Sequence, residues 1–328
     1  MYVKRRYGFW MTFNWSKEPF IYGVLYGLVI TSFSYFTQIY ISLPWAPLGL
    51  IGIAVAFYLG FKNNSSYDRI WEARKIWGSI VNNSRTFSVA VITFVQGENK
   101  SQIQKELIYR HIAWITILRH QLRLSKEWEH FEQRVKGVYA PHVSEGYNRN
   151  LDKALSNYLS TEEISELDGK TNKAAQLLKI QSLRLQELRD KEYYEDFRHM
   201  EFHKLIANFY DGQGKSERIK NFPFPRQYVT GSVWLTILFC VFVPFGLLDV
   251  MGNRVSIEFW AIPFLTGLIC WVFGLMEKIG DYSENPFEGT YNDVPITAIS
   301  RGIEIDLREM IDDSDIPEQI KDTHGFLM

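Results

Sequence analysis

Three long stretches of this chain contain no Asp, Glu, Lys or Arg, and they limit what the chain can fold into. The stretches cover residues 19–61, 227–248 and 259–276. The hydrocarbon core of a bilayer is about 30 Å thick and a helix rises about 1.5 Å per residue, so roughly 20 apolar residues span it. The first stretch has room for two crossings and each of the others for one. The sequence therefore predicts an all-α integral membrane protein with four transmembrane helices.

Prolines divide the first stretch into two helices, one near residues 20–41 and one that starts near Leu48. Between them, Pro44 and Pro47 predict a short turn around Trp45, because proline lacks a backbone N–H and clashes with the preceding helical turn. A signal peptide is the alternative interpretation of the first segment. Because eighteen residues precede that segment and no small-residue cleavage site follows it, we expect a membrane helix.

The third and fourth segments each contain one proline and one cysteine. Membrane helices tolerate proline where neighbouring groups satisfy the freed carbonyl, so we expect kinks at Pro244 and Pro263. Cys240 and Cys270 form neither a disulfide framework nor a metal-ligand pair at motif spacing. We expect both thiols to be packing groups.

Basic residues predict the orientation, since cytoplasmic loops of membrane proteins are enriched in Lys and Arg. They flank the first helix, follow the second and precede the third: Lys4, Arg5, Arg6, Lys17, Lys62, Arg69, Arg74, Lys75 and Arg226. The first external link carries no charge, and the second, residues 249–258, holds only Arg254 as a base. The pattern predicts a multi-pass protein of the cell membrane with both termini in the cytoplasm.

The same pattern divides the chain into five parts. They are an N-terminal cytoplasmic segment (1–18), the first membrane pair (19–61), a cytoplasmic helical domain (62–226), the second membrane pair (227–276) and a C-terminal cytoplasmic segment with a tail (277–328). Apolar residues recur three and four apart in residues 103–124 and 174–188, which predicts helices there. A further helix is expected near residues 295–311, before the acidic tail.

Several classes of function find no support. The 36 basic and 37 acidic residues nearly balance, so no nucleic-acid partner is expected. His199 and His203 have a metal-ligand spacing on a helix, but Glu201 is two residues from each, and the HExxH arrangement is absent. We expect structural or surface histidines rather than a zinc site. No phosphate-binding loop or nucleophile motif appears, so neither an enzyme nor a cofactor is indicated.

The second hydrophobic helix shows no turn signal after Phe61, and we expect it to leave the membrane and continue inward. On it, Ile53, Phe57 and Phe61 are four residues apart and form one stripe about 12 Å high. Around an axis shared by several copies, this stripe would form a narrow apolar constriction that gates by dewetting. Ordinary helix packing is the alternative, because the spacing alone fits both.

A polar collar follows this stripe directly. It consists of Lys62, Asn63, Asn64, Ser65 and Ser66. An ion that leaves a dry constriction could be rehydrated there, although a boundary facing lipid headgroups would have the same composition.

Five blocks of sequence carry a family resemblance, and they cover residues 60–78, 217–228, 243–249, 285–295 and 301–307. The first block closely resembles the segment after the pore neck in the bacterial branch of the bestrophin family. Block two is similar to the family's link into the third membrane helix, block three to its exit, and the last two blocks to its C-terminal signature. The blocks occur in the family's order and with its four-helix layout.

The resemblance implies a homopentamer around one central pore, narrowed by a neck of three hydrophobic rings. Carried over residue by residue, these rings fall on Ile53, Phe57 and Phe61. A second constriction near the cytoplasmic exit falls near Phe197, counted back from Pro225 in the matched block. Animal members bind calcium after the Asn-Pro-Phe motif, but residues 288–293 offer too few carboxylates here for six to eight oxygen ligands. No metal site is expected.

The leading hypothesis is an ion channel for small monovalent ions, with anions such as chloride favoured and with membrane lipid and other copies of the chain as partners. A sodium or potassium channel of the same fold is the first alternative, because an apolar neck carries no charge to reveal the sign. A membrane-anchored interaction protein without conductance is the second.

Overall fold

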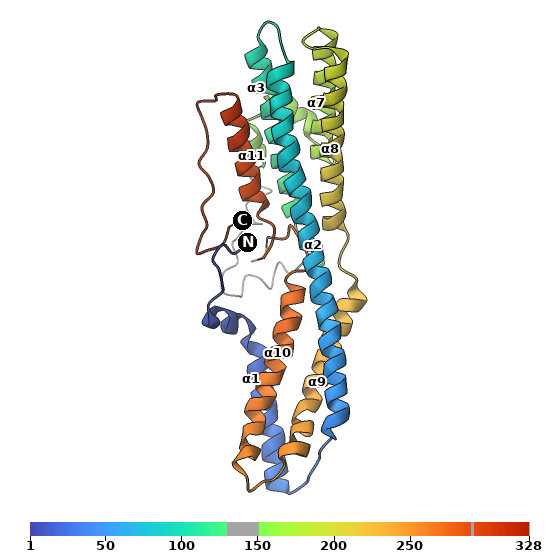
Figure 1. Ribbon diagram of the computed structural model, residues 1–328, viewed down its shortest axis with the longest axis vertical. Helices are drawn as coiled ribbons and strands as arrows, with labels where there is room; N and C mark the ends of the chain where they lie inside the picture. The colour runs from blue at the N-terminus through green and yellow to red at the C-terminus, as the bar shows by residue number, and fades with distance from the viewer. Residues whose placement is uncertain (130–150, 290–291, 328) are drawn as a thin grey trace.

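The structure is a computed structural model that describes residues 1–129, 151–289 and 292–327. Two helical bundles follow one another along the long axis of the molecule (Figure 1). We call the first the apolar bundle: α1 (Phe9–Thr37), the first half of α2 (Trp45–Phe94), α9 (Arg226–Met251) and α10 (Ile262–Asp281). We call the second the polar bundle: the second half of α2, α3 (Lys100–Arg123), α7 (Lys173–Asp190), α8 (Asp196–Asn221) and α11 (Ile296–Met310).

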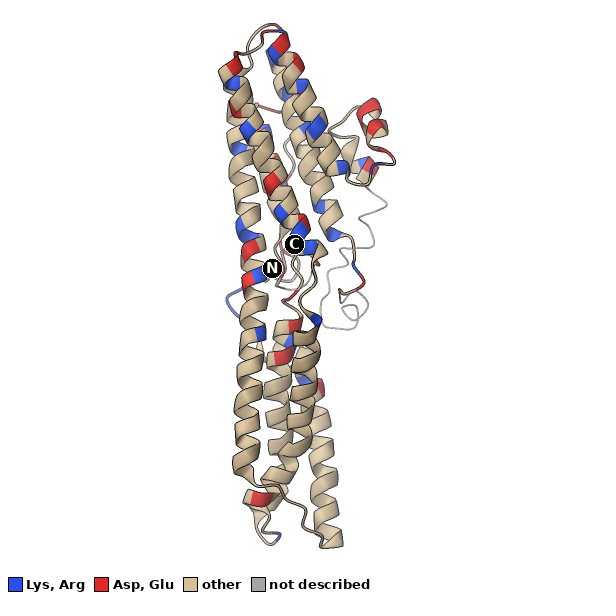
Figure 2. Cartoon of the chain, turned by 90° about the vertical axis from the view of Figure 1, so that its right-hand side faces the viewer, with Lys and Arg blue, Asp and Glu red and all other residues tan. Residues whose placement is uncertain are grey.

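The four helices of the apolar bundle are each long and apolar enough to cross a membrane, as the charge-free stretches predict. Figure 2 shows charged residues over the polar bundle and at the junction, with very few along the rest of the apolar bundle. The prediction of four apolar helices is therefore confirmed.

Helix α2 runs through both bundles as a single helix of 50 residues. The expectation that it continues beyond the membrane segment is confirmed. The expected turn around Trp45 is wrong, because α2 begins at that residue. Pro47 lies in the first helical turn, where a missing N–H breaks no helical hydrogen bond. The free N–H of Trp45 instead donates to Oδ2 of Asp249 at 3.1 Å.

Helix α1 begins at Phe9 and ends at Thr37, so it lies earlier in the chain than the expected residues 20–41. Pro19 lies inside it, and its missing N–H frees the carbonyl of Trp15, four residues earlier. Nζ of Lys278 donates to that carbonyl at 2.5 Å, which explains why the helix continues through the proline. The helix ends where Gln38 adopts a left-handed conformation with φ 57°.

Prolines in the other two apolar helices behave differently from one another. Pro244 lies inside α9, as expected. Pro263 lies in the first turn of α10, after a short 3₁₀ helix, η1 (Ile257–Ala261), so the kink expected there is wrong. A proline in the first turn removes no helical hydrogen bond.

Large aromatic side chains fill the core of the polar bundle, among them Trp77, Trp114, Phe87, Phe202 and Phe209. The helices predicted over residues 103–124, 174–188 and 295–311 correspond to α3, α7 and α11, and they are confirmed. Helix α8 completes the bundle, and α5 (Leu151–Leu155) and α6 (Thr161–Leu167) are short.

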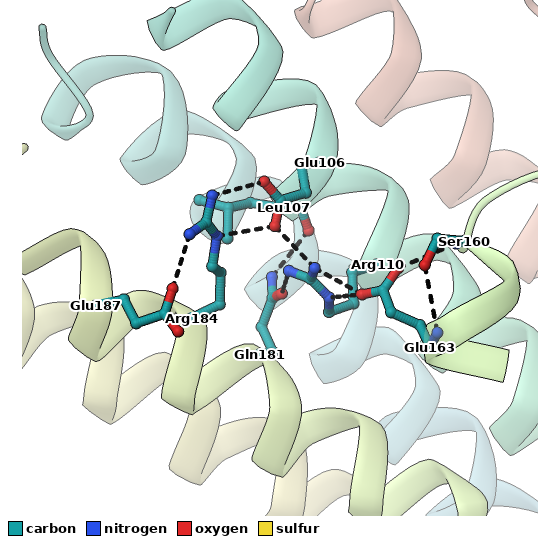
Figure 3. Close-up of polar contacts among 8 residues, drawn as sticks. All are labelled: Glu106, Leu107, Arg110, Ser160, Glu163, Gln181, Arg184 and Glu187. Carbon is teal, nitrogen blue, oxygen red and sulfur yellow. Dashed lines mark hydrogen bonds and ion pairs between the residues drawn. The ribbon is translucent and has the colours of Figure 1, made fainter. Parts of the chain in front are cut away.

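One charged side chain joins three of these helices (Figure 3). Arg110 of α3 binds Glu106 of the same helix at 2.8 Å, Glu163 of α6 at 2.6 Å and Oε1 of Gln181 of α7 at 3.0 Å. Glu163 also completes a capping box with Ser160 at the start of α6. The network therefore holds the short helix α6 against the long helices.

Candidate pore-lining site

The three predicted neck residues lie on an exposed stripe of α2. Ile53 is 60% exposed, Phe57 66% and Phe61 65%. The ring centroids of Phe57 and Phe61 are 6.2 Å apart. Val55 and Leu59, on the other side of the same helix, are buried in a core shared with α9 and α10. In a single chain, α2 thus has a packed face and an uncovered apolar face.

The exposed stripe continues beyond Phe61, but its chemistry changes. At three- and four-residue spacing it presents Asn64, Asp68, Trp71, Lys75, Ser79 and Asn82, all exposed. An apolar surface on the membrane-spanning half of α2 is therefore continuous with a mainly polar surface on the other half. The change occurs one helical turn after Phe61.

The structure divides the predicted collar. Asn64 and Ser65 are exposed, Asn63 is half-buried, and Lys62 and Ser66 are fully buried. Lys62 and Ser66 therefore do not belong to an exposed collar. Since consecutive helical residues point about 100° apart, Lys62 leaves the stripe of Phe61 and faces α9 and α10. Its Nζ lies 2.8 Å from Oε1 of Glu277.

Phe197 lies far from the neck residues. It is 86% exposed and sits in the first turn of α8. The neighbouring Arg198 donates to the carbonyl of Phe94, the last residue of α2, at 3.4 Å. Phe94 follows Phe61 by 33 residues of one helix, so Phe197 lies about 50 Å along the molecule from Phe61.

The two histidines near Phe197 differ in exposure. His203 is exposed, whereas His199 is partly buried, and this burial, with Arg189 nearby, lowers the pKa of His199. Within the described ranges, no group of three or more His, Cys, Asp or Glu residues could hold a metal ion.

The segment that follows Asn-Pro-Phe folds around the buried carboxylate of Asp293. Its oxygens accept backbone N–H groups from Phe287, Gly289 and Val294 at 2.6–2.8 Å. Arg123 of α3 lies 2.5 Å from Oδ2. Of residues 288–293, Thr290 and Tyr291 lie outside the described residues. The carboxylate of Asp293 is thus occupied by hydrogen-bond donors and one guanidinium.

Sequence reasoning missed the interior polar contacts of the apolar bundle. Lys62 and Glu277 pair across 215 residues of sequence, and Asp249 reaches the start of α2 across 204. The sequence does contain a signal for the Lys62–Glu277 pair. Each of these residues is the first charged residue after a charge-free stretch.

Known proteins resemble this chain in sequence and in fold. Residues 17–309 match the sequence model of a family described as bacterial and fungal bestrophin protein. The voltage-dependent anion channel-forming protein YneE of Escherichia coli K12 is 28% identical over 292 residues, which are 89% of this chain and 85% of that protein. A protein named in the same way from Ralstonia nicotianae is 26% identical over 279 residues, 85% of this chain and 81% of that one. The crystal structure of a bacterial bestrophin homologue from Klebsiella pneumoniae shares the fold, with a TM-score of 0.75 at 24% identity over 90% of this chain and 98% of that one. With nearly the whole chain matched, this protein belongs to the bestrophin family.

Proposed function

We propose that this protein is an anion channel in which α2 helices from several copies surround one pore. The observation that carries the proposal is the uncovered stripe of α2, apolar through Ile53, Phe57 and Phe61 and mainly polar beyond Asn64. Such a stripe suits an ion path that narrows in the membrane and widens outside it. Anions are favoured because the curated relatives are named anion channel-forming proteins.

In this proposal five copies assemble around the axis, as the family resemblance implies. Three rings of apolar side chains then form a neck about 12 Å high. Water leaves so narrow an apolar space readily, and a dry neck blocks ions until it widens. The polar stripe from Asn64 onward rehydrates an ion that has passed Phe61.

The polar bundle would form the cytoplasmic domain around a wider extension of the pore. Phe197, strongly exposed at the far end of this bundle, would supply the second constriction. Both termini would lie in the cytoplasm.

The neck is tested by replacing Ile53, Phe57 and Phe61 together with Ala and recording currents from purified protein in planar bilayers. We expect the variant to conduct almost continuously, because the smaller rings leave the neck wetted. The matched control is Leu25, Val29 and Phe33 of α1, which have the same spacing and are also exposed. Their replacement by Ala should leave gating unchanged. Wild-type gating in the neck variant would contradict the proposal.

Selectivity is tested by the reversal potential under a KCl gradient. A reversal near the chloride equilibrium potential supports an anion channel. A reversal near the potassium value would instead make the protein a cation channel with the same neck. Absence of current from the intact, membrane-inserted protein would favour an interaction protein without conductance.

A further inference from the structure

An ion pair with a fully buried lysine and a largely buried glutamate joins three helices of the apolar bundle beside the proposed neck. Lys62, the residue after Phe61 on α2, has no exposed side-chain surface, and its Nζ lies 2.8 Å from Oε1 of Glu277 on α10. The same Nζ donates to Oγ of Ser232 on α9 at 3.3 Å. The Lys62–Glu277 pair therefore ties α2 to both helices that pack behind its exposed stripe.

Stability alone does not account for such a pair. Removing two charges from water costs about as much free energy as their attraction returns, and apolar residues of similar volume fill such sites equally well. The pair does restrict geometry. Because Lys62 is fully buried, its Nζ reaches Glu277 and Ser232 together only over a limited range of rotations of α2 about its axis.

Side chains that pack against a glycine of α10 beside the pair narrow this geometry further. A Cβ atom at Gly280 of α10 would lie 2.2 Å from Oδ1 of Asn63 and 3.4 Å from Cδ of Lys62. The last turn of α10 therefore rests directly on the residues that follow Phe61. Rotation of α2 in this contact would force the side chains of Asn63 and Lys62 to repack against α10.

We infer that the Lys62–Glu277 pair sets the rotation of α2 and thereby aims the ring of Phe61 into the pore. The inference rests on the proposed function, because it assigns a positioning role for the neck. Lys62 and Glu277 themselves do not contact the permeating ion. They affect gating only by fixing the position of the Phe61 ring. Without the pair, α2 rotates more freely, and the lowest ring of the neck no longer has one position.

The decisive variant is Lys62→Met, recorded as single channels in planar bilayers. We expect the ratio of closed to open time to change on the order of tenfold, because a fraction of the free energy lost with one partner of a buried pair is enough for such a change. Introduced into the neck variant with Ala at positions 53, 57 and 61, Lys62→Met should change nothing further, because no ring remains to be positioned. An equal change in both backgrounds would overturn the inference.

A second buried lysine provides the matched control. Lys220 of α8 pairs with Glu129, and its side chain is nearly as buried as that of Lys62, but the pair lies outside the apolar bundle. Lys220→Met should lower the thermal stability as Lys62→Met does, while gating stays as in the wild type. If Lys220→Met changes gating to the same extent, the effect is general destabilisation and the inference is wrong.

A double variant, Lys62→Met with Glu277→Met, covers the case in which the single variant fails to fold. Replacing both partners by apolar side chains leaves no unpaired charge, so this protein should assemble. It should still show the altered ratio of closed to open time, and wild-type gating would overturn the inference.

If the neck variant conducts continuously while the double variant gates normally, only the inference fails. If the neck variant itself gates normally, the proposed neck fails and the inference fails with it.

Discussion

His111 illustrates how one buried residue makes the polar bundle sensitive to acid. Its ring lies 4.4 Å from the ring of Phe209, centroid to centroid, and Nε2 lies 2.9 Å from Oγ of Ser84. Burial without a countercharge lowers the pKa of His111 to about 3. The folded protein therefore keeps this imidazole neutral far below the pH at which an unfolded chain protonates it.

This residue predicts a pH dependence of the free energy of unfolding. Above about pH 6.5 both states hold a neutral imidazole, and His111 contributes no slope. Between about pH 6.5 and 3 only the unfolded state binds the proton, so stability falls as the pH falls, by about 2 kcal/mol at pH 5. His111→Asn should lose less stability than wild type between pH 7.5 and 5, measured by denaturation in detergent. His203→Asn, at an exposed site, is the control. Equal losses in His111→Asn and wild type would contradict the argument.

The contacts of Arg110 also predict an effect on stability (Figure 3). Arg110→Met leaves the carboxylate of Glu163 and the amide oxygen of Gln181 without the guanidinium between α3, α6 and α7. We expect a loss of roughly 3 kcal/mol, because breaking a buried pair strands its partner. Arg189→Met removes two ion pairs on the exposed surface and should change the melting temperature little. Similar melting temperatures for the two variants would exclude a structural role for the Arg110 network.

Helices α1 and α10 pack through small residues, the most extensive contact between helices in the described part of the chain. A Cβ atom at Gly23 would lie 2.8 Å from Cα of Gly267, and one at Gly27 would lie 2.9 Å from Cα of Pro263. Between apolar helices in lipid, close backbone approach of this kind supplies the packing that holds the helices together.

The contact predicts that Gly23→Ala destabilises the protein although alanine favours helices. The added methyl group meets backbone atoms of α10, so the two helices must separate, at a cost of about 1–3 kcal/mol. Gly302→Ala in α11 is the matched control, since its Cβ would meet no atom within 4 Å. Thermal unfolding in detergent should separate the two variants, and an unchanged melting temperature for Gly23→Ala would show that α1 and α10 tolerate separation.

Over the whole molecule, α2 connects the two bundles and the chain ends meet between them. The N–H of Val3 donates to the carbonyl of Gly325 at 2.8 Å, and the N–H of Leu327 donates to the carbonyl of Met1 at 2.8 Å. Both ends therefore lie beside the junction of the bundles (Figure 1). If all four apolar helices cross a membrane, as we propose, both ends and the polar bundle lie on the same side of it.

Cysteine labelling in intact cells tests this arrangement. In a variant with Cys240 and Cys270 replaced, a cysteine introduced by Val255→Cys, in the exposed link between α9 and α10, should react with a membrane-impermeant maleimide from outside. A cysteine introduced by Glu318→Cys, exposed in the tail, should react only after permeabilisation. The reverse pattern would mean that the basic residues do not decide the orientation of this chain.

Local composition determined the number, order and approximate limits of the membrane helices. Hydropathy and charge act over one helix length, so the four apolar helices and the continuation of α2 beyond Phe61 follow from the sequence. Helix ends follow less well, because the carbonyl of Trp15 that Pro19 frees is satisfied by Lys278, from 263 residues away. A local pattern contains no record of such a contact.

Only the tertiary structure decided which apolar stripe stays uncovered and which charge is buried. The triplet of Ile53, Phe57 and Phe61 has the same spacing as the triplet of Leu25, Val29 and Phe33. The distinction lies in the helix that carries each stripe: among the described helices, α2 is the one that continues from an apolar exposed face into the polar bundle. Lys62 likewise has the sequence context of a surface residue, and it is buried only because α9 and α10 pack over it. Burial depends on which distant segments meet, and that information is distributed over the whole chain.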